Sequence, residues 1–202
     1  MSKLINTNAS QGLEVERYKS IFTQIDRLIE EKGGGIIAIE GGSAAGKTTL
    51  AKLIADKYEC NVFHMDDFFL RPEQRTPQRF AQVGGNIDHE RFLSEVLEPL
   101  SKGENVTYRK FLCSSMTLGE EERVIPKELV IVEGAYSMHP ELAKFYDFSV
   151  FLDISEQLQR ERILHRNSPQ MAQRFFTQWI PLEKTYFEKT DIRNRCDMII
   201  KI

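Results

Sequence analysis

The sequence is short of cysteine and has no long apolar run. Its three cysteines, Cys60, Cys113 and Cys196, are far apart and lack the paired spacing of a zinc site or a disulfide framework. We therefore expect reduced thiols and a cytoplasmic protein. No apolar stretch approaches the roughly 18 residues of a membrane-spanning helix, and the first residues lack the apolar core of a signal peptide. Neither secretion nor membrane insertion is expected.

An excess of charge of either sign is also absent. Lys and Arg total 27 against 30 Asp and Glu, so the formal net charge is −3. This balance supplies no global field for holding nucleic acid or an anionic membrane, and any anion site must be local. Hydrophobic residues make up 41% and charged residues 28%, which excludes disordered and collagen-like chains. The composition is that of a globular protein.

Short apolar runs alternate with helical periodicity along the chain. Buried strands are expected at residues 36–40, 62–65, 129–133, 148–153 and 198–202, and helices at about 13–32, 48–58, 88–102, 156–165 and 170–188. Residues 70–85 are rich in Pro, Gln, Arg and Gly and predict an exposed loop. Strands that alternate with helices predict a three-layer α/β fold with a mostly parallel sheet.

A phosphate-binding motif follows the first expected strand. The pattern G-x-x-x-x-G-K-[ST], or Walker A, is made of Gly41, Gly42, Ser43, Ala44, Ala45, Gly46, Lys47 and Thr48. Glycines permit a loop whose N–H groups converge on phosphate oxygens, and the helix that begins there adds its positive dipole end. Lys47 can reach the β- and γ-phosphates, and the Thr48 hydroxyl can bind Mg²⁺. The alternative is a chance Gly-rich turn, so the strand-turn-helix context is what predicts ATP binding.

Other classes of P-loop protein lack support in the sequence. It has no Asn-Lys-x-Asp for reading guanine, no Asp-x-x-Gly switch and no Leu-Ser-Gly-Gly-Gln transporter signature. A kinase of a small acceptor remains. Asp66 and Asp67 directly follow the second expected strand, where a carboxylate can approach the γ-phosphate, orient an acceptor hydroxyl and take its proton. The alternative for either carboxylate is a helix cap.

These motifs together resemble the uridine kinase family of P-loop nucleoside kinases, which is related to phosphoribulokinase; the Asp-Asp-Phe-Phe segment is also similar to nicotinamide riboside kinases. The matching segments run in order as Gly41–Thr49, Asp66–Phe69, Asn86–His89, Glu133–Gly134 and Arg160–Arg174. The resemblance implies a three-layer α/β/α P-loop NTPase fold with a helical lid. It divides the chain into an N-terminal helical extension (1–35) and a single kinase domain (36–202), with an acceptor hairpin at about 104–127 and the lid at about 160–176.

The resemblance also implies roles for single residues. Asp66 would be the catalytic base, Phe69 would pack near the acceptor, and Asp88 would hold ribose hydroxyls, although it also suits a helix N-cap. Tyr108 and Phe111 would contact the acceptor base from the hairpin, or would simply pack there.

Metal and phosphate ligands are implied as well. Glu133 would hold Mg²⁺ together with Thr48, unless it faces solvent at the strand end, and Thr49 would extend the nucleotide-binding loop. Arg162 and Arg166 share one helical face and would act in catalysis by neutralising the transferring phosphoryl group. Arg174, beyond a break at Ser168-Pro169, would bind the nucleotide; a solvated basic face is the alternative for each arginine. The four scattered histidines are not expected to be ligands or bases.

The acceptor is the least determined part of the prediction. Uridine kinases carry Tyr-Asp-Phe followed by a histidine, whereas residues 108–113 read Tyr-Arg-Lys-Phe-Leu-Cys with no histidine nearby. We expect an ATP- and Mg²⁺-dependent kinase that phosphorylates a hydroxyl of a small molecule, foremost a nucleoside 5′-hydroxyl. Alternatives are a sugar, glycerate, pantothenate or nicotinamide riboside as acceptor, or a non-catalytic ATP-binding module. The sequence leaves open whether the chain forms a homo-oligomer.

Overall fold

A parallel five-stranded sheet forms the centre of the protein, in the order β2-β5-β1-β6-β7. The computed structural model describes residues 16–202, so Leu13 of the first expected helix lies outside it. The strands are β1 (Gly35–Gly41), β2 (Cys60–His64), β5 (Leu129–Glu133), β6 (Phe148–Asp153) and β7 (Met198–Lys201). The five predicted strands are confirmed, because continuous β-branched and apolar runs suit strands covered on both faces.

One face of the sheet is covered by α2 (Lys19–Lys32) and α3 (Lys47–Lys57). Successive residues of β1 point to opposite faces, and Ile37 and Ile39 pack into this layer with Ile21 and Ile25 of α2. Gly33 ends α2 in the left-handed conformation, with φ 79°, as its place after the periodic segment predicts. The division at residue 35 stays a prediction, although α2 packs on the same sheet as the rest of the chain.

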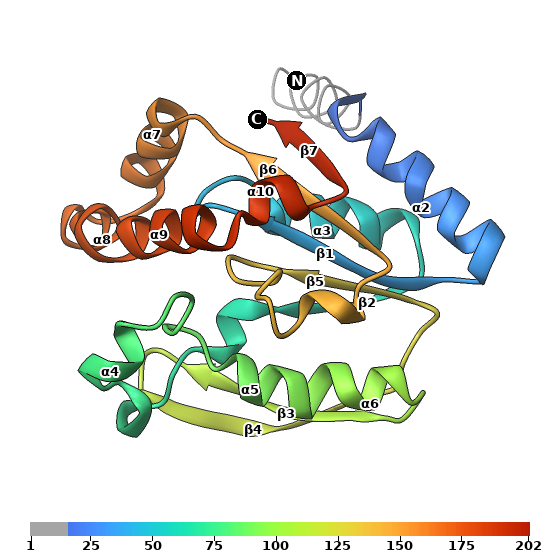
Figure 1. Ribbon diagram of the computed structural model, residues 1–202, viewed down its shortest axis with the longest axis horizontal. Helices are drawn as coiled ribbons and strands as arrows, with labels where there is room; N and C mark the ends of the chain where they lie inside the picture. Colours follow the sequence, from blue (N-terminus) through green and yellow to red (C-terminus); the bar gives the residue numbers. More distant parts are fainter. Residues whose placement is uncertain (1–15) are drawn as a thin grey trace, which may run out of the picture.

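The opposite face is covered by a continuous helical segment and a hairpin (Figure 1). The helical segment comprises α5 (His89–Phe92), the π-turn η3 (Leu93–Leu97) and α6 (Glu98–Ser101). The hairpin pairs β3 (Val106–Leu112) with β4 (Thr117–Val124) in antiparallel fashion. Aromatic contacts join the parts, since the Phe68 ring meets Phe92 edge-on at 4.8 Å between centroids and stacks on Tyr108 at 5.5 Å.

The C-terminal helices gather at one end of the sheet (Figure 1). They are α7 (Glu156–Arg166), α8 (Pro169–Arg174), the π-turn η5 (Phe175–Trp179), α9 (Ile180–Thr190) and α10 (Ile192–Arg195). The predicted break between α7 and α8 is present because the Ser168 hydroxyl accepts the Met171 N–H and Pro169 opens the new helix. The three-layer α/β/α architecture is confirmed. No helix among residues 16–202 is long and apolar enough to cross a bilayer.

Short turns complete the chain between these elements. They are η1 (Met65–Phe68), η2 (Pro72–Gln74), α4 (Pro77–Phe80) and η4 (Ala143–Phe145). The predicted loop at 70–85 therefore contains only single helical turns. Because β1, β2 and β5 are parallel neighbours, their carboxyl ends meet at one edge of the sheet, and the register pairs Glu133 with both His64 and Ile39.

Candidate active site

A cavity of about 1070 Å³ opens at the carboxyl edge of the sheet. Parallel α/β sheets place ligands at this edge, where neighbouring strands continue to opposite sides. Most residues predicted for the site line this cavity: Ser43, Ala44, Gly46, Lys47, Thr48, Thr49, Asp66, Phe69, Glu133, Arg162, Arg166 and Arg174. The structure therefore brings together segments that lie more than a hundred positions apart.

The Walker A loop runs directly from β1 into α3. Gly46 caps α3 in a left-handed conformation with φ 101°, and Gly41 has φ 145°, where an added Cβ would lie 2.6 Å from the Leu152 carbonyl oxygen. Glycine is thus required at both positions. The Lys47 ammonium donates to the carbonyl oxygens of Gly41 at 2.8 Å and Gly42 at 3.0 Å. Gly41, Gly42 and Ala45 are buried behind the loop surface.

Thr48 and Glu133 meet beside the loop. The Thr48 hydroxyl donates to Glu133 Oε1 at 2.9 Å, and the same oxygen lies 2.6 Å from His64 Nδ1. Glu133 is 5% exposed, so it does not face solvent as the alternative for a strand-end carboxylate supposed. The hydrogen bond to the Glu133 carboxylate raises the pKa of His64. A hydroxyl and a carboxylate oxygen at this separation are ligands that suit Mg²⁺.

Asp66 opens into the cavity from η1, the turn that follows β2. Enclosure by the cavity walls raises the pKa of Asp66, the Lys47 charge lowers it, and the Glu133 charge raises it. Asp66 is therefore subject to the charges of both Lys47, the predicted phosphate-binding lysine, and Glu133, the candidate metal ligand. A carboxylate with a raised pKa accepts a proton more readily, as a general base must.

Arginines of the helices α7 and α8 also line the cavity. The Arg162 guanidinium donates to the carbonyl oxygens of Ala44 at 2.9 Å and Ala45 at 3.3 Å, contacts that a purely solvated basic face would not make. Arg166 lies 5.6 Å from the centre of the Phe175 ring, and Arg174 lines the cavity. Arg162 thus lies against the Walker A loop, and Arg166 and Arg174 add positive charge to the same cavity.

Two residues at the loop were not anticipated from the sequence. Glu183 of α9 is 4% exposed, and its Oε2 accepts the Ser43 N–H at 2.9 Å while its Oε1 accepts the Ser43 hydroxyl. Gln159 Nε2 of α7 donates to the Ser43 carbonyl at 2.9 Å. The sequence signal that could have indicated Glu183 was its charge within a predicted helix that also carries the aromatic Tyr186.

One part of the cavity is more apolar, and we call it the acceptor end because Phe69, which is predicted to pack near the acceptor, lines it. Its walls include Phe69, Leu70, Phe80, Asn86, Cys113 and Met116. Arg75 is the cation of this end: its Nε donates to the Leu70 carbonyl at 2.9 Å and its guanidinium carbon lies 5.5 Å from the Phe111 ring centre. Among residues 16–202 no carboxylate forms an ion pair with Arg75.

Three residues predicted for acceptor binding do not line the cavity. Asp88 is 2% exposed and accepts the Arg91 N–H at 3.2 Å as the N-cap of α5. Tyr108 packs in the core against Phe68, and Phe111 is 4% exposed. The capping and packing alternatives describe these contacts, and any role toward an acceptor stays a prediction.

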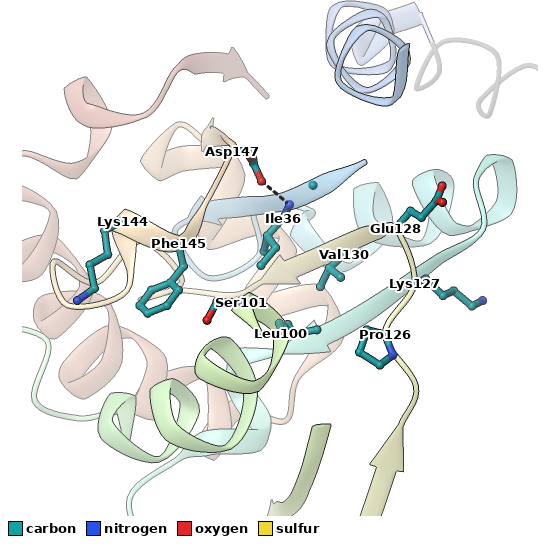
Figure 2. A pocket seen from close by; sticks show the side chains of 11 residues that line it. Ile36, Leu100, Ser101, Pro126, Lys127, Glu128, Val130, Lys144, Phe145 and Asp147 are labelled. Carbon is teal, nitrogen blue, oxygen red and sulfur yellow. Dashed lines mark hydrogen bonds between the residues drawn. The ribbon is translucent and has the colours of Figure 1, made fainter. Parts of the chain in front are cut away.

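A second, smaller cavity of about 410 Å³ lies at the opposite, amino-terminal edge of the sheet. Figure 2 shows its apolar side chains, including Ile36, Leu100 and Phe145, with Lys127 and Lys144 toward its rim. Asp147 Oδ2 accepts the Ile36 N–H there at 3.0 Å. No Walker A residue or candidate base reaches this cavity, so the larger one is the candidate active site.

Two proteins of known name are similar to this chain in sequence. The chain is 25% identical over 160 residues to phosphoribulokinase from Synechocystis sp., which covers 77% of this chain and 46% of that protein. It is 28% identical over 148 residues to uridine kinase from Bacillus cereus (strain B4264), covering 69% of this chain and 68% of that one. The chain thus spans about half the length of the phosphoribulokinase.

A solved structure shares the fold. It is a "Possible Uridine Kinase" from Bacillus stearothermophilus, with a TM-score of 0.65 and 20% identity, covering 90% of this chain and 99% of that one. The model of the phosphoribulokinase/uridine kinase family matches residues 36–178. This match takes in the Walker A loop, Asp66, Glu133 and the three arginines gathered at the cavity, and the chain therefore belongs to the phosphoribulokinase/uridine kinase family.

Proposed function

We propose that the protein is an ATP-dependent kinase that transfers the γ-phosphoryl group to a hydroxyl of a small molecule, with a nucleoside 5′-hydroxyl as the first acceptor class to test. One observation carries the proposal: the Asp66 carboxylate opens into the cavity that also holds Lys47 and the Thr48–Glu133 pair. A phosphoryl transferase needs these three functions in one space.

The phosphate end of the cavity, which we define as the part lined by the Walker A loop and the three arginines Arg162, Arg166 and Arg174, can stabilise the charge of the transferring group. The loop amides and Lys47 hold the phosphates, and Arg166 and Arg174 line the same cavity. Phosphoryl transfer passes through a loose transition state, so that positioning and charge neutralisation supply most of the catalysis. Thr48 and Glu133 would hold Mg²⁺, which neutralises phosphate charge when it is bound.

Asp66 is the group suited to the acceptor hydroxyl. It would accept a hydrogen bond from that hydroxyl, orient its oxygen in line with the γ-phosphate and take the proton as the new P–O bond forms. Its raised pKa favours the last of these tasks. Phe69 lines the same cavity and would offer an aromatic ring to a base or another flat group.

A second acceptor class is favoured by Arg75. Asp88, Tyr108 and Phe111 do not line the cavity, whereas an arginine without a carboxylate partner among residues 16–202 does. Guanidinium groups bind carboxylates and phosphates in preference to neutral hydroxyls. An alcohol that carries an anionic group, such as glycerate or a pantothenate-like acid, is therefore the second candidate.

The test is a screen for acceptor-dependent ADP release. Purified protein with ATP and Mg²⁺ is offered nucleosides, neutral sugars and acidic alcohols in separate reactions, and each phosphorylated product is identified by its mass. We expect release well above the no-acceptor rate for one class. Tight ATP binding without a phosphorylated product from any class would instead favour a non-catalytic ATP-binding module.

A further inference from the structure

A buried carboxylate occupies hydrogen-bond donors of the phosphate-binding loop. Glu183 is 4% exposed and accepts both donors of Ser43, the backbone N–H at 2.9 Å and the hydroxyl. In Walker A loops the backbone N–H groups form the cradle for phosphate oxygens. The Glu183 carboxylate is thus an anion already bound to one of these N–H groups.

Glu183 lines the same cavity as Lys47 and Asp66. Burial raises the pKa of Glu183, the Lys47 charge and the hydrogen bonds from Ser43 lower it, and the Asp66 charge raises it again. Glu183 therefore lies within range of both Lys47 and Asp66. Lys47 would serve the β- and γ-phosphates and Asp66 the acceptor, so the terminal phosphate would lie in the cavity that Glu183 also lines.

The contact between Glu183 and the Walker A loop is close and leaves little room for a phosphate oxygen at the Ser43 N–H. Gln159 Nε2 donates a hydrogen bond to the Ser43 carbonyl oxygen. A Cβ added at Gly42 would lie 3.0 Å from Gln159 Nε2 and 3.6 Å from Glu183 Oε2. Helices α7 and α9 are thus packed directly on the first turn of the loop. A phosphate oxygen that binds the Ser43 N–H must displace the Glu183 carboxylate or lie beside its negative charge.

We propose that Glu183 is an internal competitor of the terminal phosphate of the nucleotide and sets the relative affinity of the loop for ATP and ADP. The inference rests on the proposed function in one respect, that the loop binds a nucleotide. A triphosphate adds negative charge next to Glu183, and the like charges repel in a site that is poorly screened. ADP carries its charge further from this carboxylate, so Glu183 weakens ATP binding more than ADP binding.

The test measures the affinities of Mg²⁺·ATP and Mg²⁺·ADP by calorimetry for the wild-type chain and for Glu183→Gln. The glutamine keeps the size of the side chain and an acceptor oxygen but removes the charge. We expect ATP to bind at least about fivefold more tightly to the variant, with a smaller change for ADP. The matched control is Glu188→Gln, which removes the same charge from an exposed position of α9 and should change neither affinity.

Each other outcome has a definite meaning. Unchanged or weaker ATP binding by Glu183→Gln, or an equal gain for both nucleotides, would overturn the inference while leaving the proposed function intact. Absence of ATP binding by the wild-type chain would overturn both. Thermal unfolding checks that Glu183→Gln is folded. If it is not, Glu183→Ala replaces it, because alanine removes the carboxylate and is a good helix former. This variant must then show the same larger gain in affinity for ATP than for ADP.

Discussion

The two ends of the cavity are held by different kinds of contact. At the phosphate end, hydrogen bonds join positions far apart in the sequence: Glu183 and Ser43 are separated by 140 positions and Thr48 and Glu133 by 85. At the acceptor end, the hydrogen bond that fixes Arg75 reaches Leu70, five positions away. The phosphate end is therefore fixed by the tertiary fold, whereas the acceptor end depends on a loop.

This difference indicates how one fold can serve several acceptors. A site that rests on strands and helices is held more accurately than one that rests on a loop. Loops also tolerate sequence change better than the elements they connect. Substitutions at the phosphate end should therefore impair chemistry with every acceptor, and those at the acceptor end should change selectivity alone.

The largest expected effect concerns the buried acid that directly precedes the Walker A loop. Glu40 is fully buried, accepts the N–H groups of Gly41 and Met138 and the Tyr186 hydroxyl, and burial raises its pKa from 4.5 to about 7. The unfolded chain ionises at the lower value, so stability is lost as pH rises from 4.5 through about 7. Between these limits the free energy of unfolding of the wild type should fall by roughly 3 kcal/mol relative to that of Glu40→Gln. Urea unfolding of both chains across this range measures it; parallel pH curves would contradict the assignment.

The next effect tests whether the proposed base acts on chemistry alone. Asp66→Asn removes the proton acceptor but leaves the loop and Lys47 in place, so turnover should fall by about 10²-fold or more while ATP affinity stays nearly intact. Steady-state kinetics and ATP titration measure the two quantities. The neighbouring variant Asp67→Asn is the control, because Asp67 faces Lys110 at 3.9 Å and does not line the cavity. Equal turnover in the Asp66 variant would remove this residue from the mechanism.

A smaller effect is expected at the candidate metal ligand. Glu133→Gln weakens the carboxylate–hydroxyl pair with Thr48, so the Mg²⁺ concentration for half-maximal activity should rise by about 10- to 100-fold. A magnesium titration at saturating ATP measures this shift. Glu128→Gln, at an exposed position just before β5, should leave the titration unchanged. If both variants behave alike, Glu133 is not a ligand and the phosphate end is less specialised than we propose.

The phosphate end could largely be predicted from the sequence, because its chemistry is written in contiguous motifs. The Walker A loop lies between a strand and a helix whose periodicities are plain, and Asp66 and Glu133 follow or end buried strands. Parallel strands bring such termini to one edge, so the meeting of Thr48 with Glu133 follows from topology. Glu183 could not be found this way, because its contact with Ser43 depends on how α9 packs against the loop.

The acceptor end shows why the burial of a hairpin side chain cannot be inferred from a family resemblance. In β3 the alternation of burial puts Val106 and Tyr108 on the face toward the core, and a register shift between Arg109 and Phe111 returns Phe111 to the same face. A bulge adds one residue to a strand and so changes which side chains face inward. Neither this shift nor the path of residues 70–85, which lack periodicity, can be read from the sequence.

The smallest effect is expected at the acceptor end and distinguishes the two acceptor classes. Arg75→Met removes the guanidinium but keeps a long side chain against the Phe111 ring. If the acceptor carries a carboxylate or phosphate, its KM should rise by about tenfold with kcat little changed, because a charge-assisted hydrogen bond contributes about 1.5–3 kcal/mol. A neutral nucleoside should show no such change. Arg71→Met is the control, since Arg71 pairs with Glu73 at 3.3 Å and does not line the cavity. A fall in kcat with every acceptor would mean that Arg75 serves the chemistry, and the separation between the two ends of the cavity would not hold.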